Sequence, residues 1–336
     1  MWRQILREAY AAHPMLVRFA AACAVFAVVT AAAGLVDART ITGAPAWNKP
    51  FKFFVSAGIY AATFAWYLAL VDDGPRGARP DRRVRIGVLA GHGIVVALTI
   101  ELVLIAMQAW RGVPSHFNRT TPFDSVVFDV MGLAIFALSA LHVVLIIVLL
   151  RTRGAGRPLV SAARWGAAIA FVGLVVGGLM VRPSTEQGAA LRLADGRGVQ
   201  GAHTVGVPDG GPGLPLVNWS TEGGDRRAPH FVGLHAMQAL PLVVLLAPAR
   251  WPTAAVLTAV RVSGVAYAVM TIAMIVQAAQ ARPVLRPGLL IGGILGAAVI
   301  GWIAMMAALA RSRRRDEAGS SGTSRSIDCD RRGGAA

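Results

Sequence analysis

The sequence predicts an all-α fold, a polytopic bundle of about eight transmembrane helices. Of its 336 residues, 55% are hydrophobic and only 15% are charged, and the mean hydropathy is +0.58, well above that of a soluble domain. Apolar runs long enough to cross the hydrocarbon of a bilayer recur along the chain, separated mostly by short basic connectors. Because lipid offers no hydrogen bonds to the backbone, these runs are expected to be helices.

The predicted spans follow one another from near the N-terminus to the tail. They lie near Leu16–Val36, Phe53–Val71, Ile86–Ala109, Ser125–Leu150, Trp165–Val181, Phe231–Pro248, Thr253–Gln277 and Leu289–Leu309. Residues 1–310 thus form the predicted bundle, which includes a long Gly-rich extracytoplasmic loop at residues 182–230. Residues 311–336 are rich in Ser, Gly, Asp and Arg and predict a disordered cytoplasmic tail.

The net charge of +16 would suggest a nucleic-acid partner in a soluble protein. Here the basic residues cluster between apolar runs, which argues against nucleic acid and indicates contact with the lipid bilayer. Arginines concentrate before the first span and after the second, fourth and eighth spans. The positive-inside rule therefore predicts that both termini are cytoplasmic, in the cell membrane of a bacterium. The apolar stretch from Phe19 to Val36 is too long for a secretory signal and predicts an uncleaved anchor.

Polar motifs gather in the connectors on the opposite, extracytoplasmic side. These connectors hold the segments Trp47–Phe53 and Arg111–Asp124, and the loop at residues 182–230. A loop of about fifty residues is longer than a connector needs, and such loops commonly cover or build a site. The alternative is a flexible Gly-rich linker.

Ionisable residues inside the spans give a sharper signal, because a charge in the hydrocarbon is costly. Glu101 lies about 12 Å from the outer end of the third span, and Gln108 lies on nearly the same stripe of that helix. Asp129 lies at the beginning of the fourth span, at a shallower level, and Asp124 lies in the connector just before it. We expect Glu101, Gln108 and Asp124 to bind a cofactor or ligand, with Glu101 as a proton acceptor or ligand. The alternatives are a structural hydrogen bond for Glu101 and an interfacial position for Asp129.

Histidines near the same face suggest a metal ion. His116, His230 and His235 are the candidate ligands, and His203 lies in the long loop. The spacing is not specific, since His230 and His235 are five residues apart and cannot chelate from one face of a helix. The other interpretations are simple hydrogen bonding and binding of an anionic or quinone-like group.

A second histidine pair lies toward the cytoplasmic side. His92 and His142 fall at matched depths in the third and fourth spans, where two histidines could hold a b-type haem. Gly91 and Gly93 would leave room for the macrocycle, although packing alone also retains buried histidines. In the eighth span, the small residues of Gly292–Gly296 predict close helix packing within a subunit or in an oligomer.

Four strings carry a resemblance. They are NKPFKF before the second span, MQAWRGVPSHFN from Met107, GAHTVGVPDGGPGLPLVNWSTEGGD from Gly201, and PHFVGLHAMQALP from Pro229. With them, the chain resembles an uncharacterised group of bacterial multi-pass membrane proteins. The resemblance covers most of the chain from Trp47 to Pro241 and implies only an integral membrane protein. Neither a GxxxxGK[ST] phosphate loop nor an HExxH zinc motif occurs.

The sequence therefore predicts a membrane protein with a polar small-molecule or metal pocket at its extracytoplasmic face, roofed by the long loop. Three functional classes stay open at this point: an enzyme or haem redox protein, a small-molecule or proton-coupled transporter, and a structural or assembly protein.

Overall fold

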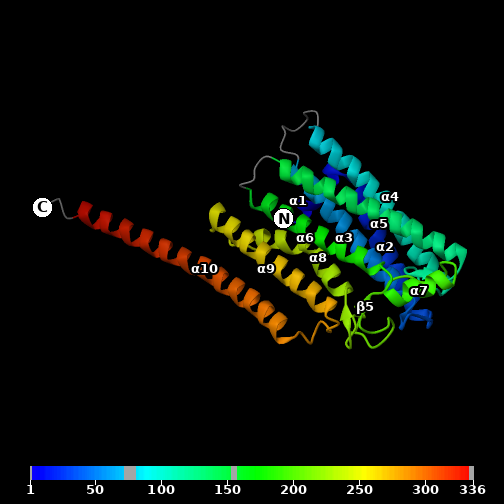
Figure 1. Ribbon diagram of the computed structural model, residues 1–336. Coiled ribbons are helices and arrows are strands. Elements are labelled where there is room, and N and C mark those ends of the chain that lie inside the picture. The colour runs from blue at the N-terminus through cyan, green and yellow to red at the C-terminus, as the bar shows by residue number, and fades with distance from the viewer. Residues whose placement is uncertain (1, 72–80, 153–156, 333–336) are drawn as a thin grey trace.

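The computed structural model describes residues 2–71, 81–152 and 157–332, with side chains as far as Arg311. Helices dominate this part of the chain (Figure 1). They are α1 (Trp2–Ala12), α2 (Pro14–Val36), α3 (Asn48–Val71), α4 (Arg82–Arg111), α5 (Pro122–Arg151), α6 (Pro158–Met180), α7 (Thr185–Leu193), α8 (Arg227–Leu245), α9 (Thr253–Ala279) and α10 (Leu289–Arg332).

The helical fold class is confirmed. Within the described residues, eight helices are long and apolar enough to cross a membrane, namely α2, α3, α4, α5, α6, α8, α9 and the Leu289–Arg311 part of α10. Each of them overlaps one of the predicted spans. The helix α6 begins earlier than expected, at Pro158 rather than near Trp165. Its Arg164 does not end the helix, because the guanidinium bonds to backbone carbonyl groups of the neighbouring α5 and Thr152.

Two helices form the centre of the bundle. The helix α3 contacts α2, α4, α6 and α8, and α6 contacts α5, α8 and α9. The helices α6 and α8 approach closely at Gly173 and Gly233, where a Cβ on Gly233 would lie 2.8 Å from the Gly173 Cα. Small residues at such crossings let two backbones approach within a membrane. The core on either side is apolar, with Phe64, Tyr67 and Leu145 fully buried.

Arginine side chains bind exposed carbonyl groups at one end of the bundle. Arg157 donates to Leu70 O of α3, and Arg164 donates to Leu149 O and Leu150 O of α5. Basic side chains stabilise helix C-termini, since the last four carbonyl groups have no partner within the helix. The basic connectors that predict a cytoplasmic face thus also cap these helices.

The opposite end, which we call the loop end, carries the irregular segments (Figure 1). Three short antiparallel pairs order it: β1 (Thr40–Ile41) with β2 (Ala44–Pro45), β3 (Asn118–Arg119) with β4 (Gly198–Val199), and β5 (Thr204–Val205) with β6 (Gly224–Asp225). The short helix α7 begins with a capping box made by Ser184 and Gln187. The segment between α6 and α8 therefore has defined structure of its own, in place of a plain Gly-rich linker.

The last helix lies at the edge of the bundle and packs mainly on α9 (orange to red in Figure 1). It continues to Arg332, beyond the predicted boundary at residue 310. The predicted disorder of the tail stays a prediction. A Cβ on Gly293 or Gly296 would meet nothing within 4 Å in the described chain. The predicted oligomer contact at these glycines stays a prediction.

Candidate functional site

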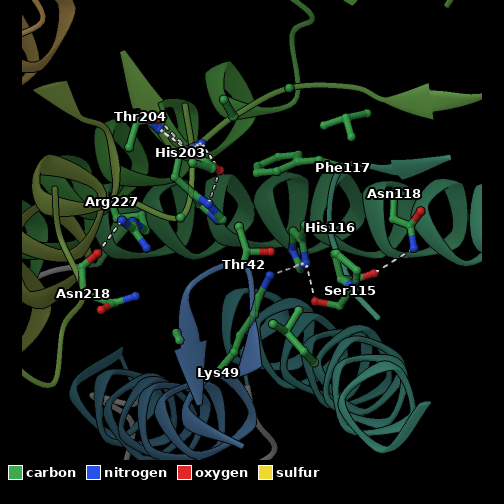
Figure 2. A pocket seen from close by; sticks show the side chains of 18 of the residues that line it. Thr42, Lys49, Ser115, His116, Phe117, Asn118, His203, Thr204, Asn218 and Arg227 are labelled. Atoms are coloured by element: carbon green, nitrogen blue, oxygen red, sulfur yellow. Dashed lines mark hydrogen bonds and ion pairs between the residues drawn. The ribbon is translucent and has the colours of Figure 1, made fainter. Parts of the chain in front are cut away.

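A cavity of about 1150 Å³ lies at the loop end (Figure 2). Its walls come from the β1–β2 hairpin, the first turns of α3, the segment between α4 and α5, and the loop between α6 and α8. The loop approaches closely at Gly201, where φ is +102° and a Cβ would lie 2.3 Å from Met180 O. Only glycine tolerates both conditions, so this residue fixes the path of the loop along the cavity.

Two lysines project from the first turns of α3 and line the cavity. The Lys49 Nζ lies 3.0 Å from His116 Nδ1, and the Lys52 Nζ donates to Val217 O at 3.3 Å. Neither lysine has a carboxylate within ion-pair distance among the described residues. Cations at a helix N-terminus are opposed by the helix dipole, which favours anions there. An anion in the cavity would relieve this unfavourable placement.

His116 reaches the cavity from the turn between α4 and β3. The next residue, Phe117, is buried and has a φ of +64°, a strained value for a bulky residue. Lysine is only a donor, so His116 Nδ1 accepts from Lys49 and the ring proton is on Nε2. Ser115 Oγ lies 3.1 Å from the same Nδ1. Burial, together with the charge of Lys49, lowers the pKa of His116 in spite of the nearby Glu101.

Glu101 lies beneath His116, in the body of α4. Its side chain is buried, and Oε1 lies 3.2 Å from His116 Nε2, at ion-pair distance but without the alignment of a hydrogen bond. Within the described residues, neither carboxylate oxygen has a hydrogen-bond partner. The structure therefore places Glu101 beside His116, two residues that the sequence singled out for different roles, with Lys49 as the third member.

A second basic group enters the cavity from the start of α8. Arg227 forms an ion pair with the buried Asp225 at 2.6 Å and also donates to Asn218 O at 2.5 Å (Figure 2). Asp225 in turn accepts from Ser220 N at 2.7 Å, which ties the end of the loop to this helix. This carboxylate pairs with Arg227 and is beyond ion-pair distance of the two lysines.

His203 and Asp209 hold together the part of the loop that faces the cavity. Asp209 accepts from His203 Nδ1 at 2.7 Å and from the backbone N–H and side chain of Thr204. Burial lowers the pKa of His203 to about 4, against the opposing effect of Asp209. Burial alone would raise the pKa of Asp209, but its bonds with His203 and Thr204 outweigh burial and the pKa is lowered.

The charge of the cavity wall is positive overall. Its basic lining residues are Lys49, Lys52, Arg182, Arg226 and Arg227, and its acidic ones are Glu186 and Asp209. One part of the wall is apolar and includes Phe53, Ile105, Ala109 and Leu179. A site of this kind suits an organic anion whose charged group meets the lysines and whose body packs on the apolar part.

The other predicted ligand-binding residues form a separate cluster. Gln108 donates to Asp124 Oδ1 at 2.9 Å, and Arg111 donates to the same oxygen at 2.6 Å and to Gln108. Thr121 caps α5 and donates to Asp124 Oδ2 at 2.7 Å. Neither Gln108 nor Asp124 lines the cavity. Their polar atoms satisfy one another, so this cluster fastens α4 to α5 outside the cavity.

The three candidate metal ligands are not brought together. His230 donates from Nδ1 to Gly173 O at 2.7 Å, whereas His235 bonds through Nδ1 to Gln238 at 3.1 Å, and neither lines the cavity with His116. No group of three or more His, Cys, Asp or Glu side chains suited to a metal ion occurs in the part of the chain that the structure describes. The geometry does not support the predicted metal site.

The histidine pair proposed for haem is separated as well. The buried His142 accepts from Tyr60 at 2.8 Å on Nδ1 and donates from Nε2 to Ala167 O at 2.8 Å, so both ring nitrogens are engaged. His92 is exposed and packs on the ring of His13, whose Nε2 occupies the space beside Gly91. A haem would need a free nitrogen on His142 and an open space at Gly91, and neither condition is met.

Sequence reasoning missed the two residues that define the cavity. Lys49 and Lys52 were not singled out within the segment Trp47–Phe53, although they are the only lysines among the 33 basic residues of the chain. All other basic residues of the chain are arginines, including those that cap helices at the opposite end. An ammonium can lose its proton and a guanidinium cannot, so this residual use of lysine was the signal that could have found the site.

Comparisons with known proteins give no further assignment: no family model, no curated protein and no solved structure matches this chain.

Proposed function

We propose that the protein is a membrane-embedded binder of small organic anions, which enter the cavity at the loop end. The observation that carries the proposal is the pair Lys49 and Lys52, which line this cavity without a carboxylate partner among the described residues. Buried or half-buried cations are normally paired. A carboxylate or phosphate group between these ammonium groups and Arg227 would supply the missing charge and would benefit from charge-assisted hydrogen bonds.

The proposal includes the placement of the molecule. The arginine-rich end faces the cytoplasm of a bacterial cell, both termini lie on that side, and the cavity opens to the outside. The support is the concentration of arginines at the end opposite the cavity. A reporter inserted after Ser220, in the loop over the cavity, would be extracytoplasmic. A cytoplasmic reporter at this position would overturn the placement without affecting the anion site.

Anion binding can be tested on the full chain in detergent by calorimetry. Benzoate, hexanoate and inorganic phosphate are the anionic probes, and tetramethylammonium is the cationic control. We expect benzoate and hexanoate to bind and tetramethylammonium not to bind. The variants Lys49→Met and Lys52→Met should each weaken binding about tenfold or more, because each removes one charge-assisted contact.

A matched control uses an exposed cation outside the cavity. Arg192 on α7 is exposed and does not line the cavity, so Arg192→Met should bind benzoate like the unchanged protein. Equal binding by Lys49→Met and the unchanged protein would overturn the proposal. Binding of tetramethylammonium in preference to benzoate would do the same.

A further inference from the structure

Glu101 combines deep burial with unsatisfied oxygens. It is 1% exposed, and neither of its carboxylate oxygens has a hydrogen-bond partner within the described residues. A buried carboxylate without hydrogen bonds is costly when it is ionised. A nearby cation or a bound proton would offset this cost, and the polar atom at ion-pair distance from the carboxylate is His116 Nε2, at 3.2 Å.

Three side chains that can each exchange a proton connect the cavity with this carboxylate. Lys49 Nζ lies 3.0 Å from His116 Nδ1, and His116 Nε2 lies 3.2 Å from Glu101 Oε1. Lys49 and His116 line the cavity, whereas Glu101 lies behind them (Figure 2 shows the first two).

Charged groups of both signs surround Lys49, His116 and Glu101. Lys49 interacts electrostatically with Glu101, Lys52, Arg227 and Asp209. His116 interacts electrostatically with His230 as well. With the cavity empty, the ammonium groups lie near the carboxylate of Glu101. An anion bound between the ammonium groups cancels their field, so the site then lacks one positive charge, which a proton taken up from the solution would restore.

We propose that binding of an organic anion in the cavity is coupled to uptake of one proton by Glu101, with His116 as the carrier. The inference rests on the proposed function of the same cavity. The bound anion attracts the Lys49 ammonium away from His116 Nδ1. His116 takes a proton from the solution on Nδ1 and passes its Nε2 proton to Glu101. The ring ends neutral in its other tautomer, and the added anion and proton leave the charge of the site unchanged.

Calorimetry in buffers of different ionisation enthalpy tests this coupling. Benzoate is titrated into the full chain in Tris, imidazole and HEPES at one pH, because the slope of the observed enthalpy gives the number of protons taken up. We expect about one proton per benzoate in the unchanged protein, and a benzoate affinity that falls about tenfold per unit rise in pH. The Glu101→Gln variant should bind benzoate but take up almost no proton.

The control is a carboxylate outside the site. Asp129 is exposed and paired with Arg119, so Asp129→Asn should retain the proton uptake of the unchanged protein. Benzoate binding without proton uptake in the unchanged protein would overturn the coupling and leave the anion site standing. Equal uptake by Glu101→Gln would also overturn it. If benzoate does not bind, or binds equally well to the Lys49→Met variant, the proposed function is overturned and the coupling with it. The measurements on the unchanged protein decide the question even where Glu101→Gln does not fold.

Discussion

The His116 Nε2 lies 3.2 Å from the Glu101 Oε1 and links the turn after α4 to the buried interior of the same helix. Because His116 Nδ1 accepts from Lys49, the ring proton is on Nε2, the atom at ion-pair distance from the carboxylate. The pair connects the cavity with the interior of the helix bundle, since His116 lines the cavity and the buried Glu101 does not.

Removing one partner should cost more stability than removing both. We expect His116→Leu to destabilise the protein by about 1–3 kcal/mol, because it leaves Glu101 buried with its nearest partner removed. The double variant Glu101→Leu/His116→Leu should be more stable than His116→Leu alone, since no uncompensated carboxylate remains. Unfolding of the purified protein by increasing SDS gives the free energies for a double-mutant cycle. Additive effects of the two substitutions would show that the two side chains do not interact.

The two lysines allow a direct chemical test of the cavity. An amine-reactive succinimidyl ester can modify only Lys49, Lys52 and the N-terminal amine, because the chain has no other lysine. We expect saturating benzoate to slow modification of both lysines several-fold, since the bound anion shields the amines and favours their unreactive charged form. Mass spectrometry of the peptides gives the rate at each position, and the N-terminal amine is the internal control. Unchanged lysine rates with bound benzoate would place that anion elsewhere.

Much of the fold was predictable from the sequence, because a segment that crosses a membrane must hydrogen-bond its backbone groups internally and therefore forms a helix. Length and hydropathy alone locate a helix such as α4, and the arginine-rich connectors predict the end that bears the helix caps. Glu101 was found because a carboxylate among apolar residues stands out. Its depth in the helix indicated His235 and Gln238 as neighbours, whereas the structure places His116 beside it.

The partners of the other site residues were not predictable, because they depend on contacts between distant segments. Asp124 is satisfied by Gln108 and Arg111, and His142 by Tyr60 and a carbonyl group of α6. Sequence spacing gives the depth of a side chain but not the neighbour that it faces. The role of Lys49 depends in the same way on the loop folding back over the start of α3.

The loop over the cavity should loosen in acid. The pKa of His203 is lowered to about 4 from 6.5, so the folded loop binds fewer protons than the unfolded loop. The contribution of the neutral His203 ring to the free energy of unfolding is therefore present in full above about pH 6.5 and is lost as the pH falls toward 4. The lowered pKa of Asp209 acts in the same direction at still lower pH. Lys49 and Arg227 also oppose a positive charge on His203.

Hydrogen exchange of residues 201–211 at pH 7 and pH 5, corrected for intrinsic rates, measures this effect. We expect protection to fall at pH 5 in the unchanged protein. His203→Gln keeps a donor for Asp209 but does not titrate, so its protection should change less between the two pH values. Equal protection of the unchanged protein at both pH values would contradict the prediction.

The close crossing of α6 and α8 should tolerate no added methyl group. In Gly233→Ala the new Cβ would lie 2.8 Å from Gly173 Cα, so the two helices must separate, at a cost of about 1–3 kcal/mol. Gly178, also on α6, is the matched control, because a Cβ there meets nothing within 4 Å in the described chain. Gly178→Ala should be neutral or stabilising by up to about 1 kcal/mol, since alanine is the better helix former. SDS unfolding of both variants measures the difference, and equal stabilities would show that this contact does not hold the two helices together.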